Sequence, residues 1–186
     1  MSDYHDLQQK HPELFGNDHA MIQIIHNPET IQAWQVERSQ ALALQGKPTS
    51  WADIGVVFED PYFFIVRDLV QFPNGRMNGY ARVLSHANLN GGRGVVVLPE
   101  YEGRIMLLRQ YRHPTRQWHY EVPRGYGEAN IPAAENARKE VLEETGGEIA
   151  DLQELGELYN NTGFEGGAVS LFYARLASIG QPNADE

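Results

Sequence analysis

Residues 121–147 combine a short apolar stretch, a glycine-rich loop and a run of glutamates that ends in two glycines. Asn130 and Pro132 are typical of the start of a helix, the first as a cap and the second as a first-turn residue. Gly146 and Gly147 are typical of a helix end. A strand that enters a glycine loop and then an acidic helix fixes the order of elements around which the rest of the chain must fold.

The predicted helix has an apolar stripe and an acidic side. The stripe consists of Ala134, Ala137, Val141 and Leu142, and the residues away from it are Asn136, Glu140, Glu143 and Glu144. Like charges three and four residues apart repel one another, and a bound cation removes that repulsion. Carboxylate oxygens suit a hard ion such as Mg²⁺ or Mn²⁺, which also binds substrate phosphate. The alternative is a row of glutamates that is merely solvated.

The spacing resembles the signature of the Nudix hydrolases. That signature reads Gly, five residues, Glu, seven residues, Arg-Glu, an apolar residue, any residue, Glu-Glu, any residue, Gly and an apolar residue. The matching positions are Gly125, Glu140, Val141, Glu143, Glu144 and Gly146. Three positions depart from the pattern, with Lys139 in place of Arg, Ile131 in place of the first Glu, and Gly147 in place of an apolar residue. Glu128 lies close enough in the loop to substitute for the missing glutamate.

The flanking segments are similar to the ADP-ribose pyrophosphatase branch of that family. They are residues 108–112, 118–125 and 159–164, and the resemblance covers roughly residues 58–175. It implies that Glu140 and Glu144 are the principal metal ligands and that Glu143 is a secondary ligand or orients a water. It also implies a ligand role for the backbone carbonyl of Arg124, which precedes the loop glycine Gly125.

The same resemblance suggests the groups that meet the substrate. Arg109 and Arg112 are candidates for the phosphates because a guanidinium binds phosphate with two parallel hydrogen bonds, although either could be a surface charge. Trp118, Tyr111 and Phe164 are candidates for stacking on a base, or else core residues. The resemblance places the catalytic glutamate of relatives at Gly167, so the candidates for the base are Glu165, two residues away, or otherwise Glu143 or a metal-bound hydroxide.

Composition limits the partners of the chain. Its formal net charge of −10 argues against non-specific binding to nucleic acid or to an anionic membrane. It contains no cysteine, no long apolar span and no signal-like start in residues 1–6, so we expect a cytoplasmic protein without disulfides or thiol chemistry. The seven histidines have no zinc-site spacing, and we interpret them as surface or core residues.

The 186 residues suggest three parts. We expect an N-terminal helical extension over 1–50, a small antiparallel sheet over 51–90, and a Nudix domain over 91–186. The strands expected are residues 62–70, 80–84, 94–99, 104–111, 152–159 and 169–175, of which 94–99 and 104–111 are expected to be covered on both faces. The resemblance implies an α+β protein with an αβα sandwich around a mixed sheet. It also implies a homodimer through the small sheet. Because relatives usually carry another helix beyond the last strand, we expect this chain to be truncated at its C-terminus.

The expected activity is Mg²⁺- or Mn²⁺-dependent hydrolysis of a nucleoside diphosphate linked to another group, with ADP-ribose or a similar sugar nucleotide first. Two alternatives stay open. One is a Nudix-fold nucleotide-binding module with little or no turnover, because Ile131 and Gly167 depart from the pattern. The other is a partner-binding protein whose acidic helix is only solvated.

Overall fold

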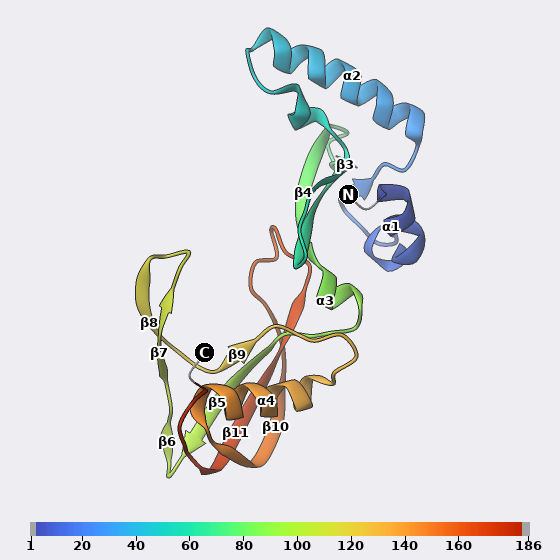
Figure 1. Cartoon of the computed structure of the whole chain (residues 1–186). Helices are drawn as coiled ribbons and strands as arrows, with labels where there is room; N and C mark the ends of the chain where they lie inside the picture. The colour runs from blue at the N-terminus through green and yellow to red at the C-terminus, as the bar shows by residue number, and fades with distance from the viewer. Residues whose placement is uncertain (1–2, 184–186) are drawn as a thin grey trace. The chain divides into compact units, whose positions relative to one another are not determined.

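The computed structural model describes residues 3–183, and the chain falls into two compact units (Figure 1). One unit contains residues 1–86 together with 163–166, and the other contains residues 87–162 and 167–186. The expectation about a signal-like start concerned residues 1–6, of which residues 1–2 lie outside the described residues, as do residues 184–186. Among the residues described, no helix is long and apolar enough to cross a membrane.

The first unit is a twisted antiparallel sheet with helices at its sides. Strand β3 (Phe63–Gln71) pairs along its length with β4 (Met77–Ser85), and its other edge pairs with β1 (Gln23–Ile24) and β2 (Gly55–Glu59). The predicted strands at 62–70 and 80–84 are therefore confirmed. Its helical elements are α1 (Tyr4–Lys10), η1 (Pro12–Leu14), α2 (Pro28–Leu44) and η2 (Thr49–Ala52). The helix predicted to open at Asn27-Pro28 is α2, which Asn27 caps by accepting a hydrogen bond from the Thr30 N–H at 2.8 Å.

A buried carboxylate ties α1 to this sheet. Asp68 is 2% exposed, and its two oxygens accept hydrogen bonds from the Tyr4 hydroxyl at 2.5 Å and from Arg82 Nε at 2.7 Å. Burial, followed by the nearby charge of Asp68, raises the pKa of Tyr4, so its phenol stays protonated. A second anchor comes from residues 163–166, because Phe164 O accepts a hydrogen bond from the Val83 N–H on β4 at 2.8 Å.

The second unit is a mixed sheet with one long helix on it. Its strands run in the order β10 (Glu148–Tyr159), β11 (Ala168–Ser178), β5 (Val95–Tyr101) and β6 (Arg104–Ile105), and β9 (Arg124–Gly125) also pairs with β5. β11 and β5 are parallel, whereas the other pairs are antiparallel. A short helix, α3 (His86–Leu89), spans the junction of the two units. The α+β class and the mixed sheet expected from the sequence are confirmed.

Helix α4 (Ala133–Thr145) packs on this sheet through a buried face that differs from the predicted stripe. Ala137 and Val141 are buried as predicted, and they pack with Val95, Val97 and residues of β11. Leu142 is 55% exposed and Ala134 is also exposed, so their place in the stripe was wrong. The buried arc runs instead through Asn136, Ala137, Val141, Glu144 and Thr145. Gly146 ends the helix in the left-handed conformation with φ of 63°.

Residues 104–111 do not form one strand covered on both faces, and that expectation was wrong. The run breaks after the two residues of β6, and Ile105 and Leu107 are about half exposed. β7 (Leu108–Arg112) then pairs with β8 (Gln117–Glu121) in a separate two-stranded hairpin. Apolar content alone cannot distinguish a central strand from a strand that pairs only within a hairpin.

Candidate active site

The glycine loop in front of α4 is held by close backbone contacts. A Cβ at Gly127 would overlap the backbone of Gly92 and Arg93, and a Cβ at Gly92 would lie 2.7 Å from the carbonyl oxygen of Glu128. From the helix, Asn136 is 1% exposed and donates from Nδ2 to the Tyr126 carbonyl at 3.0 Å. The loop is therefore fixed from two sides, by a glycine-lined backbone contact and by a buried amide.

Glu140 lies directly against the first glycine of this loop. A Cβ on Gly125 would overlap both oxygens of the Glu140 carboxylate, so only glycine leaves room for that carboxylate there. Gly125 belongs to β9 and pairs with Val95 on the central strand β5. The sheet therefore fixes the backbone on which the Glu140 carboxylate rests.

Glu144 is buried and hydrogen-bonded rather than surface-facing. It is 7% exposed; its Oε1 accepts from Gln110 Nε2 at 2.7 Å, and its Oε2 accepts from the Arg124 N–H at 3.1 Å. A buried carboxylate needs such partners because desolvation otherwise disfavours its charge. The reading of this helix side as a merely solvated row of glutamates does not fit that burial.

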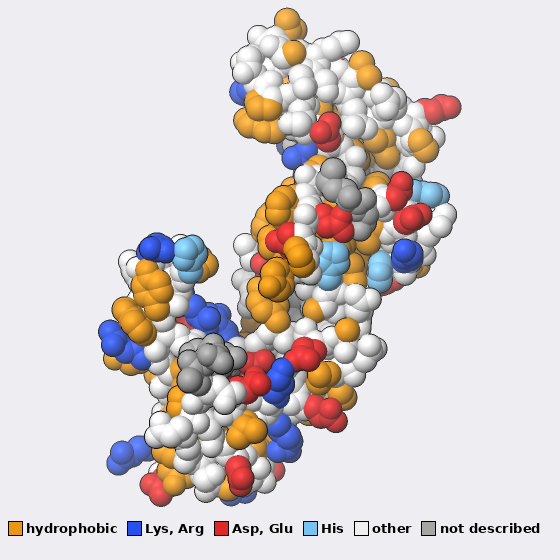
Figure 2. Space-filling view, viewed as in Figure 1, with side chains coloured by type: hydrophobic (Ala, Val, Ile, Leu, Met, Phe, Trp, Pro, Cys, Tyr) orange, Lys and Arg blue, Asp and Glu red, His pale blue; other side chains and the backbone are white. Residues whose placement is uncertain are grey.

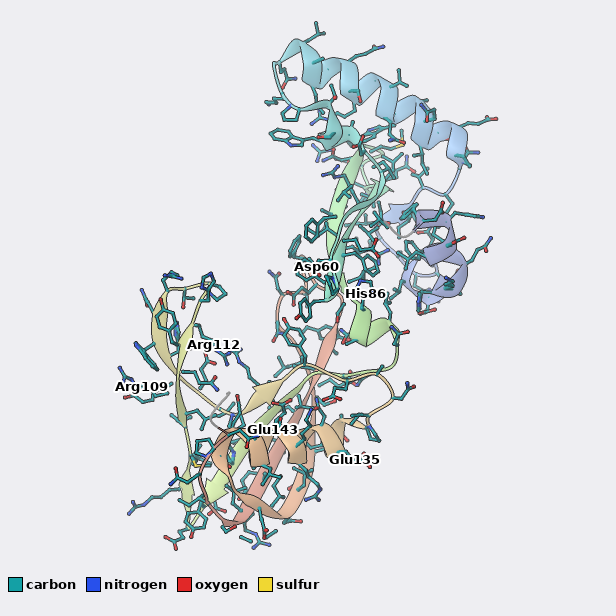
Figure 3. All side chains as sticks on the ribbon, viewed as in Figure 1. Asp60, His86, Arg109, Arg112, Glu135 and Glu143 are labelled. Carbon is teal, nitrogen blue, oxygen red and sulfur yellow. The ribbon has the colours of Figure 1, made fainter. Side chains whose placement is uncertain are left out.

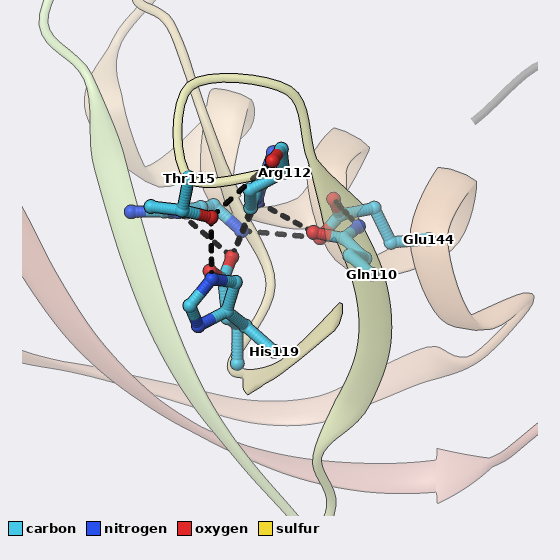
Figure 4. Close-up of polar contacts among 7 residues, drawn as sticks. Gln110, Arg112, Thr115, His119 and Glu144 are labelled. Carbon is cyan, nitrogen blue, oxygen red and sulfur yellow. Dashed lines mark hydrogen bonds and ion pairs between the residues drawn. The ribbon is translucent and has the colours of Figure 1, made fainter. Parts of the chain in front are cut away.

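The two partners of Glu144 belong to a closed ring of polar contacts, of which Figure 4 labels Gln110, Arg112 and Glu144. Gln110 Oε1 accepts from Arg112 NH2 at 2.5 Å, and Arg112 Nε donates to Glu121 Oε2 at 2.7 Å. Arg124 NH2 also donates to Glu121 Oε2 at 2.7 Å, and its backbone returns the ring to Glu144. The hydrogen bond from Arg112 is the main reason why the pKa of Glu121 lies below its ordinary value.

The inner face of the hairpin supplies three of the five residues of this ring. Gln110 and Arg112 are two residues apart on β7 and so share a face, and Glu121 on β8 pairs across from Leu108 on the same face. Beside them His119 Nε2 lies 2.6 Å from the Thr115 hydroxyl (Figure 4). The hairpin thus presents a polar side to α4.

The outer face of the hairpin carries Arg109 and Trp118. Figure 3 shows Arg109 and Arg112 pointing to opposite sides of the strand, as alternation along β7 requires. The guanidinium of Arg109 lies 4.6 Å from the ring centre of Trp118, and Trp118 meets Tyr111 edge to face at 5.7 Å. Hydrophobic and basic side chains accordingly mix over the hairpin in Figure 2. Tyr120, on the same face as Arg109, is 72% exposed. Arg112, but not Arg109, is brought together with Glu144.

The loop contains a glutamate, Glu128, although Ile131 stands where the family pattern has its first glutamate. Lys139 on α4 forms an ion pair with Glu128 in the loop, while Ile131 is half-buried. The hydrogen bond to Glu128, together with the charges of Glu143 and Glu140, raises the pKa of Lys139. Glu143 is half-buried on α4, on the turn between Glu140 and Glu144 (Figure 3).

The remaining predicted residues lie in the other unit. Phe164 and Glu165 belong to residues 163–166, beside β4, and Glu165 bridges Val83. Gly167, the position to which the family resemblance assigned the catalytic glutamate, belongs to the second unit and packs so closely on the Asn88 amide that a side chain there would displace it. Glu165 and the carboxylates of α4 therefore belong to different units.

The donor set of α4 fits a hard divalent cation. Glu140 and Glu144 reach the Arg124–Gly125 segment from successive helical turns, and their donors are all oxygens. Within residues 3–183 no three acidic or imidazole side chains already surround one point. Two carboxylates with a backbone carbonyl, water and phosphate are nevertheless a usual environment for Mg²⁺.

Three residues of the site escaped the sequence analysis: Gln110, Glu121 and the side chain of Arg124. The period-two pattern of β7 could have placed Gln110 beside Arg112, had the hairpin been recognised. No local pattern could have paired Glu121 with an arginine nine residues earlier before the register of β7 and β8 was known.

Comparisons with known proteins find a family model that matches the part of the chain containing this site. Residues 90–186, just over half of the chain, match the model of the NUDIX domain. An ADP-ribose pyrophosphatase of Bacillus subtilis (strain 168) is 28% identical over 110 residues, which are 59% of this chain and 57% of that protein. The chain thus matches less than two thirds of the length of this relative.

A crystal structure of an ADP compounds hydrolase shares the fold. It superposes with a TM-score of 0.61 at 21% identity, over 72% of this chain and 70% of that one. The NUDIX match starts just before β5 and contains the glycine loop, α4 and the hairpin that together form the ring around Glu144. On the extent of that match, this chain belongs to the Nudix family.

Proposed function

We propose that this chain is a metal-dependent pyrophosphohydrolase that cleaves the diphosphate of a nucleoside diphosphate linked to another group, with ADP-ribose or a similar sugar nucleotide as the leading substrate. The observation that carries the proposal is the convergence of Glu140 and Glu144 on the Arg124–Gly125 segment. The relative from Bacillus subtilis supports the choice of substrate.

In this proposal Glu140, Glu144 and the Arg124 carbonyl hold Mg²⁺ or Mn²⁺, with Glu143 as a further ligand or as the group that orients water. The bound ion would stabilise charge on the phosphoryl oxygens and lower the pKa of a coordinated water. Arg112 lies on the same face of β7 as Gln110, the partner of Glu144, and binds the diphosphate. Water adds to one phosphorus and the bridging P–O bond breaks, which yields a nucleoside monophosphate and the phosphate ester of the other group.

The base that takes the proton of the water is either Glu143 or Glu165. Glu143 shares the helix with the ligands, whereas Glu165 belongs to the other unit. The variants E143Q and E165Q separate the two, because only the loss of the base removes the acidic limb of the pH profile of kcat/KM.

A panel of nucleotides tests the reaction class. The purified chain is incubated with ADP-ribose, ADP-glucose, NADH and ATP in Mg²⁺, in Mn²⁺ or in EDTA, and released monophosphate is measured. We expect AMP from ADP-ribose with either metal and none in EDTA. Hydrolysis that is undiminished in EDTA, or absent for every diphosphate, would contradict the proposal.

A second candidate is a nucleotide-binding module with weak turnover. It is favoured by the packing of Gly167 against Asn88, which leaves no side chain at the position of the catalytic glutamate in relatives. Saturable binding of ADP-ribose without release of AMP, in the same Mg²⁺ buffer, identifies this case.

The chain's assembly and location stay predictions. We propose a cytoplasmic homodimer that associates through the small sheet of the first unit, with a small-molecule nucleotide as its ligand and no nucleic acid or membrane partner. Light scattering coupled to size exclusion gives the mass in solution, and a mass near 21.0 kDa would mean a monomer.

A further inference from the structure

We propose that the guanidinium of Arg124 is a second phosphate ligand and that, with Arg112, it forms a two-arginine subsite for the diphosphate. The inference rests on the proposed function of the same site. It concerns the side chain of Arg124, which lies beside the backbone segment assigned to the metal.

The geometry of an anion between the two arginines is already present in the chain. Glu121 Oε2 lies 2.7 Å from Arg112 Nε and 2.7 Å from Arg124 NH2. One carboxylate oxygen thus brings two guanidinium groups to the same point, and Glu121 itself is only 17% exposed in its side chain. A half-buried anion between two arginines holds them at a fixed separation, so less side-chain entropy is lost when a ligand binds.

Both arginines keep access to solvent while they contact Glu121. The side chain of Arg124 is 48% exposed and that of Arg112 is 32% exposed. A guanidinium has five N–H donors in a planar fork, and the contact with Glu121 uses only the NH2 group of Arg124. Each arginine can therefore donate to a phosphoryl oxygen while Glu121 continues to hold it.

Charge makes a second arginine useful here. Glu140, Glu143 and Glu144 bring three negative charges to the site, in a chain with a formal net charge of −10. One divalent ion leaves that group negative, and a diphosphate adds further negative charge. Arg112, Arg124 and Glu121 together carry a net charge of +1. If either arginine is removed, the remaining arginine and Glu121 form a neutral pair.

The experiment compares R124A and R124Q with R116A. Arg116 is a matched control because it is an exposed arginine in the turn between β7 and β8, the hairpin that carries Arg112. It contacts His113 and Tyr111 but no residue of the ring. Kinetics with ADP-ribose and Mg²⁺ give KM and kcat. Titration calorimetry with inorganic pyrophosphate in EDTA gives phosphate affinity independently of metal and turnover. Melting temperatures check the fold.

We expect R124A and R124Q to raise KM at least about tenfold and to weaken pyrophosphate binding by a similar factor, as for the loss of a charge-assisted hydrogen bond. R116A should leave both values unchanged. Hydrolysis and pyrophosphate affinity in R124A that equal those of R116A would overturn the subsite but leave the enzyme proposal intact. Arg124-dependent pyrophosphate binding in a chain that hydrolyses none of the nucleotides would retain the subsite and reject the enzyme.

Discussion

The side-chain amide of Gln110 on β7 donates a hydrogen bond to Oε1 of the buried Glu144 on α4 at 2.7 Å, so a hairpin residue orients a helix carboxylate. The same amide accepts a hydrogen bond from Arg112 through its oxygen. Gln110 thereby couples a group assigned to phosphate with a group assigned to metal. Removing that coupling should change both functions.

Replacement of Gln110 by alanine should lower kcat and Mn²⁺ affinity by about tenfold or more, the usual cost of removing a residue that orients a metal ligand. Electron paramagnetic resonance of free Mn²⁺ measures the affinity without any substrate. Q117A is the control, because Gln117 lies exposed on β8 of the same hairpin. An unchanged Mn²⁺ affinity in Q110A would contradict the orienting role of Gln110.

The variant E144Q should reduce kcat by about a hundredfold or more, since it removes roughly 3 kcal/mol of transition-state stabilisation by the metal. Glutamine also keeps only one oxygen where Glu144 accepts two hydrogen bonds, so we expect a loss of about 1 kcal/mol in unfolding free energy. E135Q, on the exposed first turn of α4 (Figure 3), should leave both quantities unchanged. Near-normal turnover in E144Q would remove Glu144 from the ligands.

Two glycine substitutions in one loop should affect different properties, the first the catalytic rate and the second the stability of the fold. In G125A the new Cβ meets the end of the flexible Glu140 side chain, which can move, so the fold should survive while kcat falls about a hundredfold. In G127A the new Cβ meets the backbone of Gly92 and Arg93, which cannot move readily, so unfolding free energy should fall by about 1–3 kcal/mol. Assays of kcat and thermal melts on both variants give the comparison. A large drop in melting temperature for G125A, with kcat unchanged, would show that Glu140 does not use this space.

The ring should make stability depend on pH in the acid range. Hydrogen bonding from Arg112 lowers the pKa of Glu121 in the folded chain. The ionised form of Glu121 is therefore more stable in the folded state than in the unfolded chain. The resulting stabilisation is present above the unfolded pKa of about 4.3 and is lost as pH falls through the folded value. Urea unfolding of the wild type and E121Q should differ at pH 7 and converge towards pH 3. Equal differences at both pH values would argue against this origin.

The sequence predicted the elements of the second unit better than their burial. Helix α4 and strands β5, β10 and β11 follow from the glycine stop and from apolar runs that are local in the chain. The cap predicted at Asn130 was wrong, because α4 begins at Ala133 behind Pro132, which is the N-cap and makes no side-chain capping hydrogen bond. Leu142 was misplaced because the direction of the buried face depends on how the helix axis crosses the sheet, which periodicity does not define.

The candidate site was predictable only where it follows a fixed spacing. Glu140 and Glu144 follow from the helix alone, because residues four apart share a side. The ring needs the register of β7 against β8 and the approach of that hairpin to α4, which are long-range contacts. Arg124 shows the difference most clearly: its backbone position came from the motif, and its side-chain partner came only from the fold.

The parallel pairing of β5 with β11 has a consequence for how this protein is made. β5 is complete at residue 101, whereas its parallel neighbour begins at residue 168, so the central strand waits for most of the second unit to be synthesised. Residues 163–166, which anchor to β4 of the first unit, emerge from the ribosome in the same late interval. The four-stranded sheet of the first unit is already complete at residue 85, so the sheet of the second unit is the last to form, and a nascent chain paused before residue 168 would expose an unpaired edge of β5 to chaperones.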